Sequence, residues 1–353
     1  FFDITIITPV FRKGKVIAYF VSTIHHTDIG GYGVGAGARD VHEEGLWIPR
    51  AKLYEAGKPN EVLFDIIRHN VRTKDEVMGD IAAQVSSGKV GAKRLQLLCD
   101  RHNLDDIDDL SAEIIERSEA ATRESIRKLK GGTYHGESRF DIPGGAEILL
   151  KCAMTIDAEA GSVHIDFEGS SGASPHGVNV VLNYTHAYAT FALRSTLDPD
   201  LPNNYGSLTP ITVSAPEGCI VNAKYPSPVA ARHVVGMYVP MPILKALRQV
   251  APDAVLAEGA GAVWTFQVQG KDDAARRTKD GLGATCYPTG VAAVPVEVLE
   301  AAMPIQFTQK ELIDGSGGDG AARGGDGQVI AFHLRTKDNW LLNAVPSRLK
   351  IGA

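Results

Sequence analysis

The chain has 353 residues, of which 44% are hydrophobic, so it is long enough for two or three domains with large cores. Its 36 Lys and Arg residues against 42 Asp and Glu residues give a net charge of −6, and no basic block stands out. Nucleic acid and anionic membrane surfaces are therefore not expected partners. No apolar run approaches the roughly 20 residues of a membrane-spanning helix, and no signal peptide is seen.

The four cysteines lie far apart and form no C-x-x-C pair or zinc-finger spacing. This usage is typical of a reducing compartment, so we expect a cytoplasmic chain without a disulfide framework. The chain opens at Phe1 within a strand-like pattern, and it ends at Ala353 without a terminating pattern. We therefore expect the full protein to extend beyond both ends.

Residues 3–11 and 16–24 predict two strands, because β-branched and aromatic residues are dense in both. The connection includes Gly14, at a place where a hairpin turn favours glycine. If the two strands pair, Asp3 and His25 fall at the same end of the hairpin. A carboxylate and an imidazole can then meet there.

The end of this hairpin concentrates residues with metal-binding chemistry. His25, His26 and Asp28 lie within four positions and open onto a loop with five glycines between Gly30 and Gly37. Imidazole nitrogens and carboxylate oxygens are the usual protein ligands of a divalent metal. The central hypothesis is a metal-assisted active site in this loop. The alternative is that one histidine packs in the interior and Asp28 only starts a turn.

The expected metal ligands are Asp3, His25 and His26. Adjacent residues of a strand point to opposite faces, so one of the two imidazoles is expected to face the site. A metal held there would polarise a substrate carbonyl. Asp28 and Glu44 are the expected proton acceptors, with a supporting role in orienting the ligands as the alternative for Glu44.

The rest of the chain predicts a mixed α and β fold (α+β) with a β-rich core, glycine-rich loops and a helical insertion. Apolar residues recur at helical spacing from about 60 to 130, and residues 73–76 have the pattern of a capping box. We expect these helices to form an antiparallel, hairpin-like projection that serves as a scaffold or subunit contact. The patterns divide the chain into a β-hairpin and glycine-loop region (1–59), a helical insertion (60–135) and a mixed α/β domain (136–353).

Within the last region, strands and helices are predicted in turn. The expected strands are 147–157, 163–167, 211–214 and 328–335, and the expected helices are 180–197 and 230–250. Residues 254–313 predict a mixture of strand and glycine loop.

Several common catalytic motifs do not occur in the sequence. There is no G-x-x-x-x-G-K-[ST] phosphate loop, so ATP, if it is used, is expected to bind to another chain. No G-x-S-x-G nucleophile elbow occurs, which argues against a serine hydrolase. Cys286 has no histidine close in sequence and is interpreted as a small buried thiol.

Four residues outside the hairpin are candidates for substrate binding. His176 and Asn179 lie in a loop before a predicted helix, and Arg232 begins another helix, where an anion could bind. Arg323 lies in the glycine-rich stretch 315–327 and could bind a carboxylate or a phosphate. The alternative is that the histidine is an ordinary core or surface residue and the glycine-rich stretch a solvent-exposed turn.

Strings along nearly the whole chain resemble a known family. In order, they are HHTDIGG at 25–31, EEGLWIP at 43–49, DFEGSS at 166–171, GVN at 177–179, NYG at 204–206, APEG at 215–218, YPSPVAAR at 225–232 and RGGDGQ at 323–328. They resemble the signature of the hydantoinase B family, which provides one component of ATP-dependent hydantoinases. That family includes the B half of 5-oxoprolinase and the alpha subunit of acetone carboxylase.

The resemblance implies a hetero-oligomer of two or three kinds of subunit. A hydantoinase A-type partner of the actin-like ATPase class would bind ATP with Mg²⁺ and phosphorylate the carbonyl or enol oxygen of a small-molecule substrate. In the carboxylase branch, the B-type chain holds a divalent metal, with Mn²⁺ or Zn²⁺ expected here, through an H-x-x-D pair and a later histidine. Asp3 matches that aspartate and His25 the later histidine, whereas the first histidine of the pair would precede Phe1.

We therefore expect the catalytic B-type subunit of an ATP-dependent cyclic-amide hydrolase, acting on a hydantoin-like or oxoproline-like ring. One alternative keeps the family but changes the reaction to carboxylation of a ketone. Another is a non-catalytic subunit that only stabilises its ATPase partner.

Overall fold

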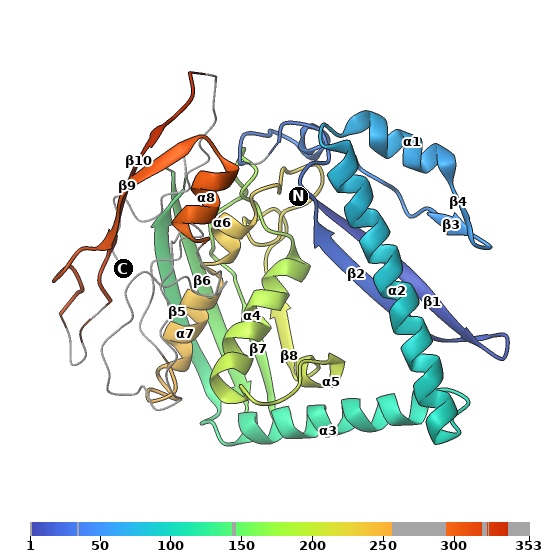
Figure 1. Ribbon diagram of the computed structural model, residues 1–353. Coiled ribbons are helices and arrows are strands. Elements are labelled where there is room, and N and C mark those ends of the chain that lie inside the picture. Colours follow the sequence, from blue (N-terminus) through green and yellow to red (C-terminus); the bar gives the residue numbers. More distant parts are fainter. Residues whose placement is uncertain are drawn as a thin grey trace.

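The computed structural model describes residues 2–33, 35–142, 146–255, 294–319, 323 and 325–337. Within these residues the fold is mixed α and β with several small sheets, which confirms the predicted class (Figure 1). The strands are β1 (Asp3–Arg12), β2 (Lys15–His25), β3 (Tyr54–Glu55), β4 (Lys58–Pro59), β5 (Gly132–Asp141), β6 (Glu147–Asp157), β7 (Ser162–Asp166), β8 (Ile211–Ser214), β9 (Ile305–Leu312) and β10 (Gln328–Leu334). The helices are α1 (Glu61–Asn70), α2 (Lys74–His102), α3 (Asp108–Arg127), α4 (Leu182–Leu197), α5 (Tyr205–Leu208), α6 (His233–Gly236), α7 (Pro240–Leu247) and α8 (Val296–Ala302), and a 3₁₀ turn covers Val41–Glu44.

The first two strands form the predicted hairpin. They pair antiparallel, and Asp3 lies directly opposite His25 in the register, which confirms that both belong to one end of the hairpin. Helix α2 lies along this pair (Figure 1). The packing is close because Gly88 of α2 has no side chain, and a Cβ there would lie 2.3 Å from Thr8 Oγ1. Gln84 fixes the helix by donating to the carbonyls of Ile4 and Ser22, each at 2.9 Å.

The main hydrophobic core lies between a four-stranded sheet and the helices packed on it. Strands β5, β6, β7 and β8 form one sheet, with β7 and β8 parallel and the other neighbours antiparallel. Helices α4 and α7 pack on this sheet (Figure 1). At its centre the rings of Phe140 and Tyr238 stack with centroids 3.7 Å apart, and both side chains are fully buried.

The helical segment differs in arrangement from the expected hairpin. Helix α2 packs on β1 and β2, whereas α3 turns away and packs against α5 and β7, so the two helices bridge the hairpin and the main sheet (Figure 1). The capping box predicted at 73–76 is wrong. Thr73 precedes α2 but makes no side-chain capping bond, because its hydroxyl lies 2.7 Å from the Thr27 hydroxyl instead.

Two further elements differ from the predictions. The single helix expected at 230–250 is divided into α6 and α7, because Pro240 at the start of α7 cannot donate the backbone hydrogen bond that a continuous helix needs. Strand β5 was missed, because its sequence is rich in Gly and polar residues. It forms a strand through its pairing with β6 and the burial of Ser138 and Phe140.

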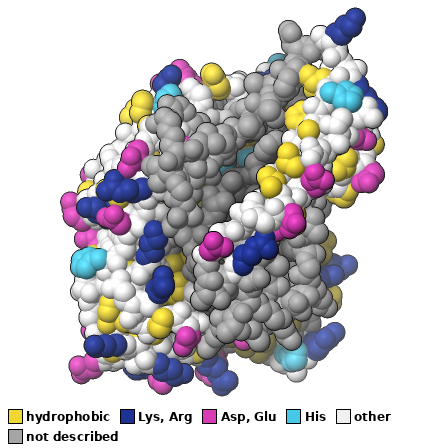
Figure 2. Space-filling view, turned by 90° about the vertical axis from the view of Figure 1, so that its left-hand side faces the viewer, with side chains coloured by type: hydrophobic (Ala, Val, Ile, Leu, Met, Phe, Trp, Pro, Cys, Tyr) yellow, Lys and Arg dark blue, Asp and Glu magenta, His cyan; other side chains and the backbone are white. Residues whose placement is uncertain are grey.

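Helix α8 lies where strand and glycine loop were expected, whereas residues 256–293, including Cys286, lie outside the described residues. Among the residues that the structure describes, no helix combines the length and the apolar character needed to cross a bilayer. On the face shown in Figure 2, basic and acidic side chains are interspersed. The division of the chain at 59 and 135 stays a prediction.

Candidate active site

The open end of the hairpin joins a carboxylate, an imidazole and a guanidinium. Asp3 Oδ1 lies 3.4 Å from His25 Nδ1, and the other oxygen of Asp3 accepts a 2.9 Å hydrogen bond from Arg232 Nη2. Arg232 also lies over the ring of Tyr184, 5.1 Å from its centroid, and Phe2 stacks on His25 at 5.5 Å. The structure thus brings together three of the residues that the sequence singled out.

A further imidazole, that of His233, lies close enough for the charges of Arg232 and His25 to affect its pKa. Burial, with the charges of Arg232 and His25 adding to it, lowers the pKa of His233 to about 4. This side chain is therefore neutral at pH 7. The sequence offered one signal for it, namely its position directly after Arg232 in the YPSPVAAR string.

His26 has surroundings quite different from those of its neighbour His25. Its side chain is fully buried, with Nδ1 3.7 Å from Asp80 Oδ2 of α2, and neither ring nitrogen has a hydrogen-bond partner among the described residues. Burial outweighs the attraction of Asp80 and lowers the pKa of His26. The separation of the two imidazoles follows from the alternation of side chains along a strand.

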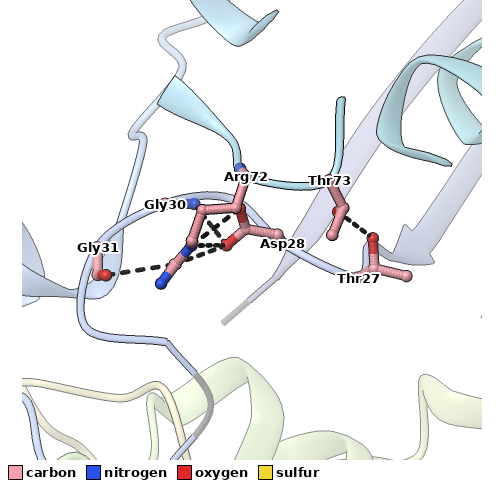
Figure 3. A network of polar contacts seen from close by, with 6 residues as sticks. All are labelled: Thr27, Asp28, Gly30, Gly31, Arg72 and Thr73. Carbon is pink, nitrogen blue, oxygen red and sulfur yellow. Dashed lines mark hydrogen bonds and ion pairs between the residues drawn. The ribbon is translucent and has the colours of Figure 1, made fainter. Parts of the chain in front are cut away.

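Asp28 is the acceptor at the centre of a compact network at the start of the glycine loop (Figure 3). Its buried carboxylate accepts a 3.0 Å bond from the Gly30 N–H, a 2.7 Å bond from Arg72 Nη2 and a further bond from the backbone N–H of Arg72. Burial would raise the pKa of the Asp28 carboxyl, but these hydrogen bonds and the charge of Arg72 together hold it below its usual range. The network ties the end of β2 to the segment before α2.

The Asp28 network predicts a specific acid sensitivity. A carboxyl whose folded pKa lies below its unfolded value of about 3.9 stabilises the fold above that pH, and the contribution is lost as the pH falls through the folded pKa. Since Arg72 is exposed, we expect Asp28→Asn to lower the free energy of unfolding by only about 1–2 kcal/mol at pH 7. The difference from wild type should shrink below about pH 4, measured by urea unfolding across the pH range.

A matched control is available in Asp65→Asn, because Asp65 pairs with Arg68 at 3.1 Å but its side chain is 62% exposed. This variant should change the unfolding free energy by less than about 0.5 kcal/mol. An Asp28→Asn variant as stable as the control at pH 7 would contradict the account of this network.

Glu44 connects the glycine loop to a segment distant in sequence, at Val229 and Ala230. Its carboxylate is 4% exposed and accepts hydrogen bonds from the backbone N–H groups of Val229 and Ala230, the latter at 2.6 Å. Gly177 also lies at this junction, where a Cβ would be in ordinary van der Waals contact with Glu44 Oε1 at 3.5 Å and with the Ala230 nitrogen at 3.6 Å. The loop that carries Arg232 is thereby fixed from both sides, since the N–H of Ala231 also donates to the Gly177 carbonyl at 2.6 Å.

Asn179 and His176 belong to the same junction. The fully buried amide of Asn179 donates to the carbonyls of Ser174, His176 and Pro228 at 2.8–3.0 Å, and its oxygen accepts from the Ser174 N–H. His176 is partly exposed, and its Nδ1 lies 3.3 Å from Nη1 of Arg39 in the glycine loop. The amide therefore holds the loop together, whereas the imidazole faces outward beside a cation.

Arg323 lies in a separate turn. It forms an ion pair with Asp326, which also accepts a 3.0 Å bond from the Gly317 N–H, and the pair closes the glycine-rich connection between β9 and β10.

The donors at Asp3 and His25 are suited to a divalent metal in type but are few in number. One carboxylate oxygen and one imidazole nitrogen face each other, and both are ligands that Zn²⁺ and Mn²⁺ accept. Within the described ranges, no group of three His, Cys, Asp or Glu side chains is placed to hold an ion. The remaining positions of an ion with about four ligands would be filled by water, by substrate or by groups outside these ranges.

The sequence and the fold both resemble known proteins. A family model described as Hydantoinase B/oxoprolinase matches residues 1–351. An uncharacterized protein of Methanocaldococcus jannaschii is 31% identical over 99% of this chain and 64% of its own length. A protein of Pseudomonas sp. strain NS671, provisionally named as the B component of a D-/L-hydantoinase, is 30% identical over 93% of this chain and 60% of its own length. The chain thus spans less than two thirds of either relative.

The fold resembles that of the ATP-dependent caprolactamase from Pseudomonas jessenii, with a TM-score of 0.82 and 24% identity over 94% of this chain and 62% of that chain. It also resembles acetone carboxylase, with a TM-score of 0.80 and 20% identity over 93% of this chain and 48% of that chain.

Proposed function

Because the chain belongs to the hydantoinase B/oxoprolinase family, we propose that it is the catalytic B-type subunit of an ATP-dependent enzyme that opens cyclic amides. The observation that carries this proposal is the meeting of Asp3, His25 and Arg232 at one end of the hairpin. Two relatives, named as components of a hydantoinase and of a caprolactamase, support ring opening as the reaction. Their names designate them as the B and the beta component of those enzymes, which supports a partner chain, and the caprolactamase of similar fold is described as ATP-dependent.

The reaction needs an activated ring, since an unstrained amide resists attack by water. Phosphorylation of the ring oxygen by the partner would make the ring carbon electrophilic. Asp3 and His25 would hold a divalent metal, Mn²⁺ or Zn²⁺, beside that carbon. When bound, such an ion would lower the pKa of water and so supply a hydroxide nucleophile for that carbon.

The other residues of the site orient this pair. Arg232 fixes one oxygen of Asp3, which leaves the other directed at His25. His233 is uncharged at neutral pH and so adds no repulsion toward a cation. The contacts of Asp28 and Glu44 favour a positioning role over the proton-acceptor role expected from the sequence, because their oxygens already accept backbone hydrogen bonds.

The proposal is tested by reconstituting the full-length protein with its ATPase partner. We expect ATP-dependent ring opening of at least one of hydantoin, 5-oxoproline and caprolactam. Chromatography of the ring-opened acid measures the product. ATP-dependent fixation of labelled bicarbonate into a ketone would instead assign the carboxylase reaction. If ring opening persisted without this chain, the chain would have a non-catalytic scaffold role.

Glu44 separates a positioning role from a chemical one. Glu44→Gln keeps an acceptor oxygen for Val229 and Ala230, whereas Glu44→Ala leaves two backbone donors without their acceptor. For a positioning residue, Glu44→Gln should retain activity within about fivefold, and Glu44→Ala should lower the unfolding free energy by about 2–4 kcal/mol and reduce activity with it. Steady-state kinetics and thermal unfolding of both variants provide the measurement. A loss of about 100-fold or more in Glu44→Gln, with unchanged unfolding, would show that Glu44 transfers a proton.

A further inference from the structure

The glycine loop carries a cation whose side-chain partner is an imidazole. Arg39 is exposed, and Nη1 of its guanidinium lies 3.3 Å from His176 Nδ1. Among the described residues, no carboxylate lies within ion-pair distance of this guanidinium, and the nearby Glu43 carboxylate instead accepts from the Arg39 backbone N–H at 2.8 Å. The charge of the guanidinium is therefore not neutralised by a paired carboxylate.

The hydrogen bond between these two side chains fixes what they can bind. A guanidinium has only donors, so Nδ1 of His176 must accept, and the ring proton must be on Nε2. The polar groups that the pair can still offer to a ligand are then donors only: the remaining N–H groups of Arg39 and the Nε2–H of His176. A site with donors only is complementary to a ligand with acceptors only, which is an oxyanion.

The pair is held in place by the backbone. The Gly177 N–H donates to the Ala36 carbonyl at 3.1 Å, which joins the His176 loop to the glycine loop next to Arg39. The Ala231 N–H donates to the Gly177 carbonyl, and Arg232 follows directly with its bond to Asp3. The Arg39–His176 pair and the Asp3–His25 pair thus belong to one set of interlocked loops.

We infer that Arg39 and His176 form an oxyanion subsite that holds the phosphoryl group of the activated ring while the carbonyl carbon lies at Asp3 and His25. This inference rests on the proposed function, since it assumes a phosphorylated substrate. A guanidinium fork matches the geometry of a phosphate, and it keeps its charge at any physiological pH. The subsite would retain the phosphorylated intermediate between the two chains until the ring opens.

The test compares Arg39→Gln with Arg50→Gln in the full-length protein assembled with its ATPase partner. Arg50 is an exposed arginine of the same segment, so the control removes the same charge nearby. Inorganic phosphate is titrated into each complex by calorimetry, with acetate at equal ionic strength as the second arm. We expect Arg39→Gln to weaken phosphate binding about tenfold or more, with Arg50→Gln unchanged and acetate bound weakly by all.

A second readout is the number of ATP molecules consumed per ring opened. Arg39→Gln should raise this ratio, because the intermediate escapes and is lost, while Arg39→Lys should restore part of the coupling. Equal phosphate affinity and equal coupling in Arg39→Gln and wild type would overturn the subsite even if ring opening is ATP-dependent. Acetate binding that depends equally on Arg39 would overturn the phosphoryl assignment. A complex that opens no ring would defeat the proposed function, while the phosphate titration would still decide on the subsite.

Discussion

Replacing Asp3 or His25 by alanine should abolish metal binding and ring opening while the chain still assembles with its partner. Each variant removes one of the two proposed metal-ligand atoms, Asp3 Oδ1 and His25 Nδ1, which lie 3.4 Å apart. Loss of a direct ligand should lower activity by more than about 100-fold, beyond the usual cost of losing a group that only orients a ligand. Elemental analysis, steady-state kinetics and gel filtration of the reconstituted complex give the three readouts.

The matched control for this experiment is His102→Ala. His102 is an exposed imidazole in the last turn of α2, well separated in sequence from the hairpin end. It should leave metal content and activity unchanged. Full metal occupancy in both Asp3→Ala and His25→Ala would remove the basis for the proposed site.

The second large effect is expected at Gly31, where the glycine loop folds back on itself. The residue has a φ of +65°, and a Cβ there would lie 2.3 Å from the Gly45 nitrogen and 2.6 Å from the Glu43 carbonyl oxygen. Both contacts involve backbone atoms, which cannot rotate away as a side chain can. Adding the strain of a left-handed alanine to this overlap, we expect Gly31→Ala to lower the free energy of unfolding by about 2–5 kcal/mol and to abolish activity.

Gly33→Ala separates the steric overlap from the backbone strain. Gly33 also has a positive φ, +95°, but a Cβ there would meet no atom of the described residues within 4 Å. This variant should cost only about 1–2 kcal/mol, from the conformation alone. Urea unfolding of the two variants side by side measures the difference, and equal values would mean that the loop does not pack as the structure has it.

Local patterns in the sequence were sufficient to predict the hairpin, but not its register, which shifts between Val10 and Phe11. Dense β-branched residues on both sides of Gly14 specify two strands with a short turn, and this places Asp3 and the His25 region at the same end of the hairpin. The helical segment from about 60 to 130, which the structure divides into α1, α2 and α3, was predicted for the same reason, because its apolar residues recur at helical spacing. The element that was missed depends on tertiary contacts, since the polar sequence of β5 forms a strand only by pairing with β6.

The partners of the site residues could not be predicted from local patterns. Arg232 reaches Asp3 across 229 positions, and Glu44 reaches Val229 across 185. Periodicity and turn chemistry act over a few residues and carry no information on such contacts. The same limit hid Arg39, because its significance comes entirely from the distant imidazole of His176.

The proposed reaction depends on a divalent metal that Asp3 and His25 hold at the place where the ring is opened. It is tested most directly by anomalous diffraction from crystals of the full-length complex grown with Mn²⁺ or Zn²⁺. We expect an anomalous peak about 2.0–2.2 Å from an Asp3 oxygen and a His25 nitrogen. A complex that is active in ring opening but shows no peak between these two side chains would contradict it.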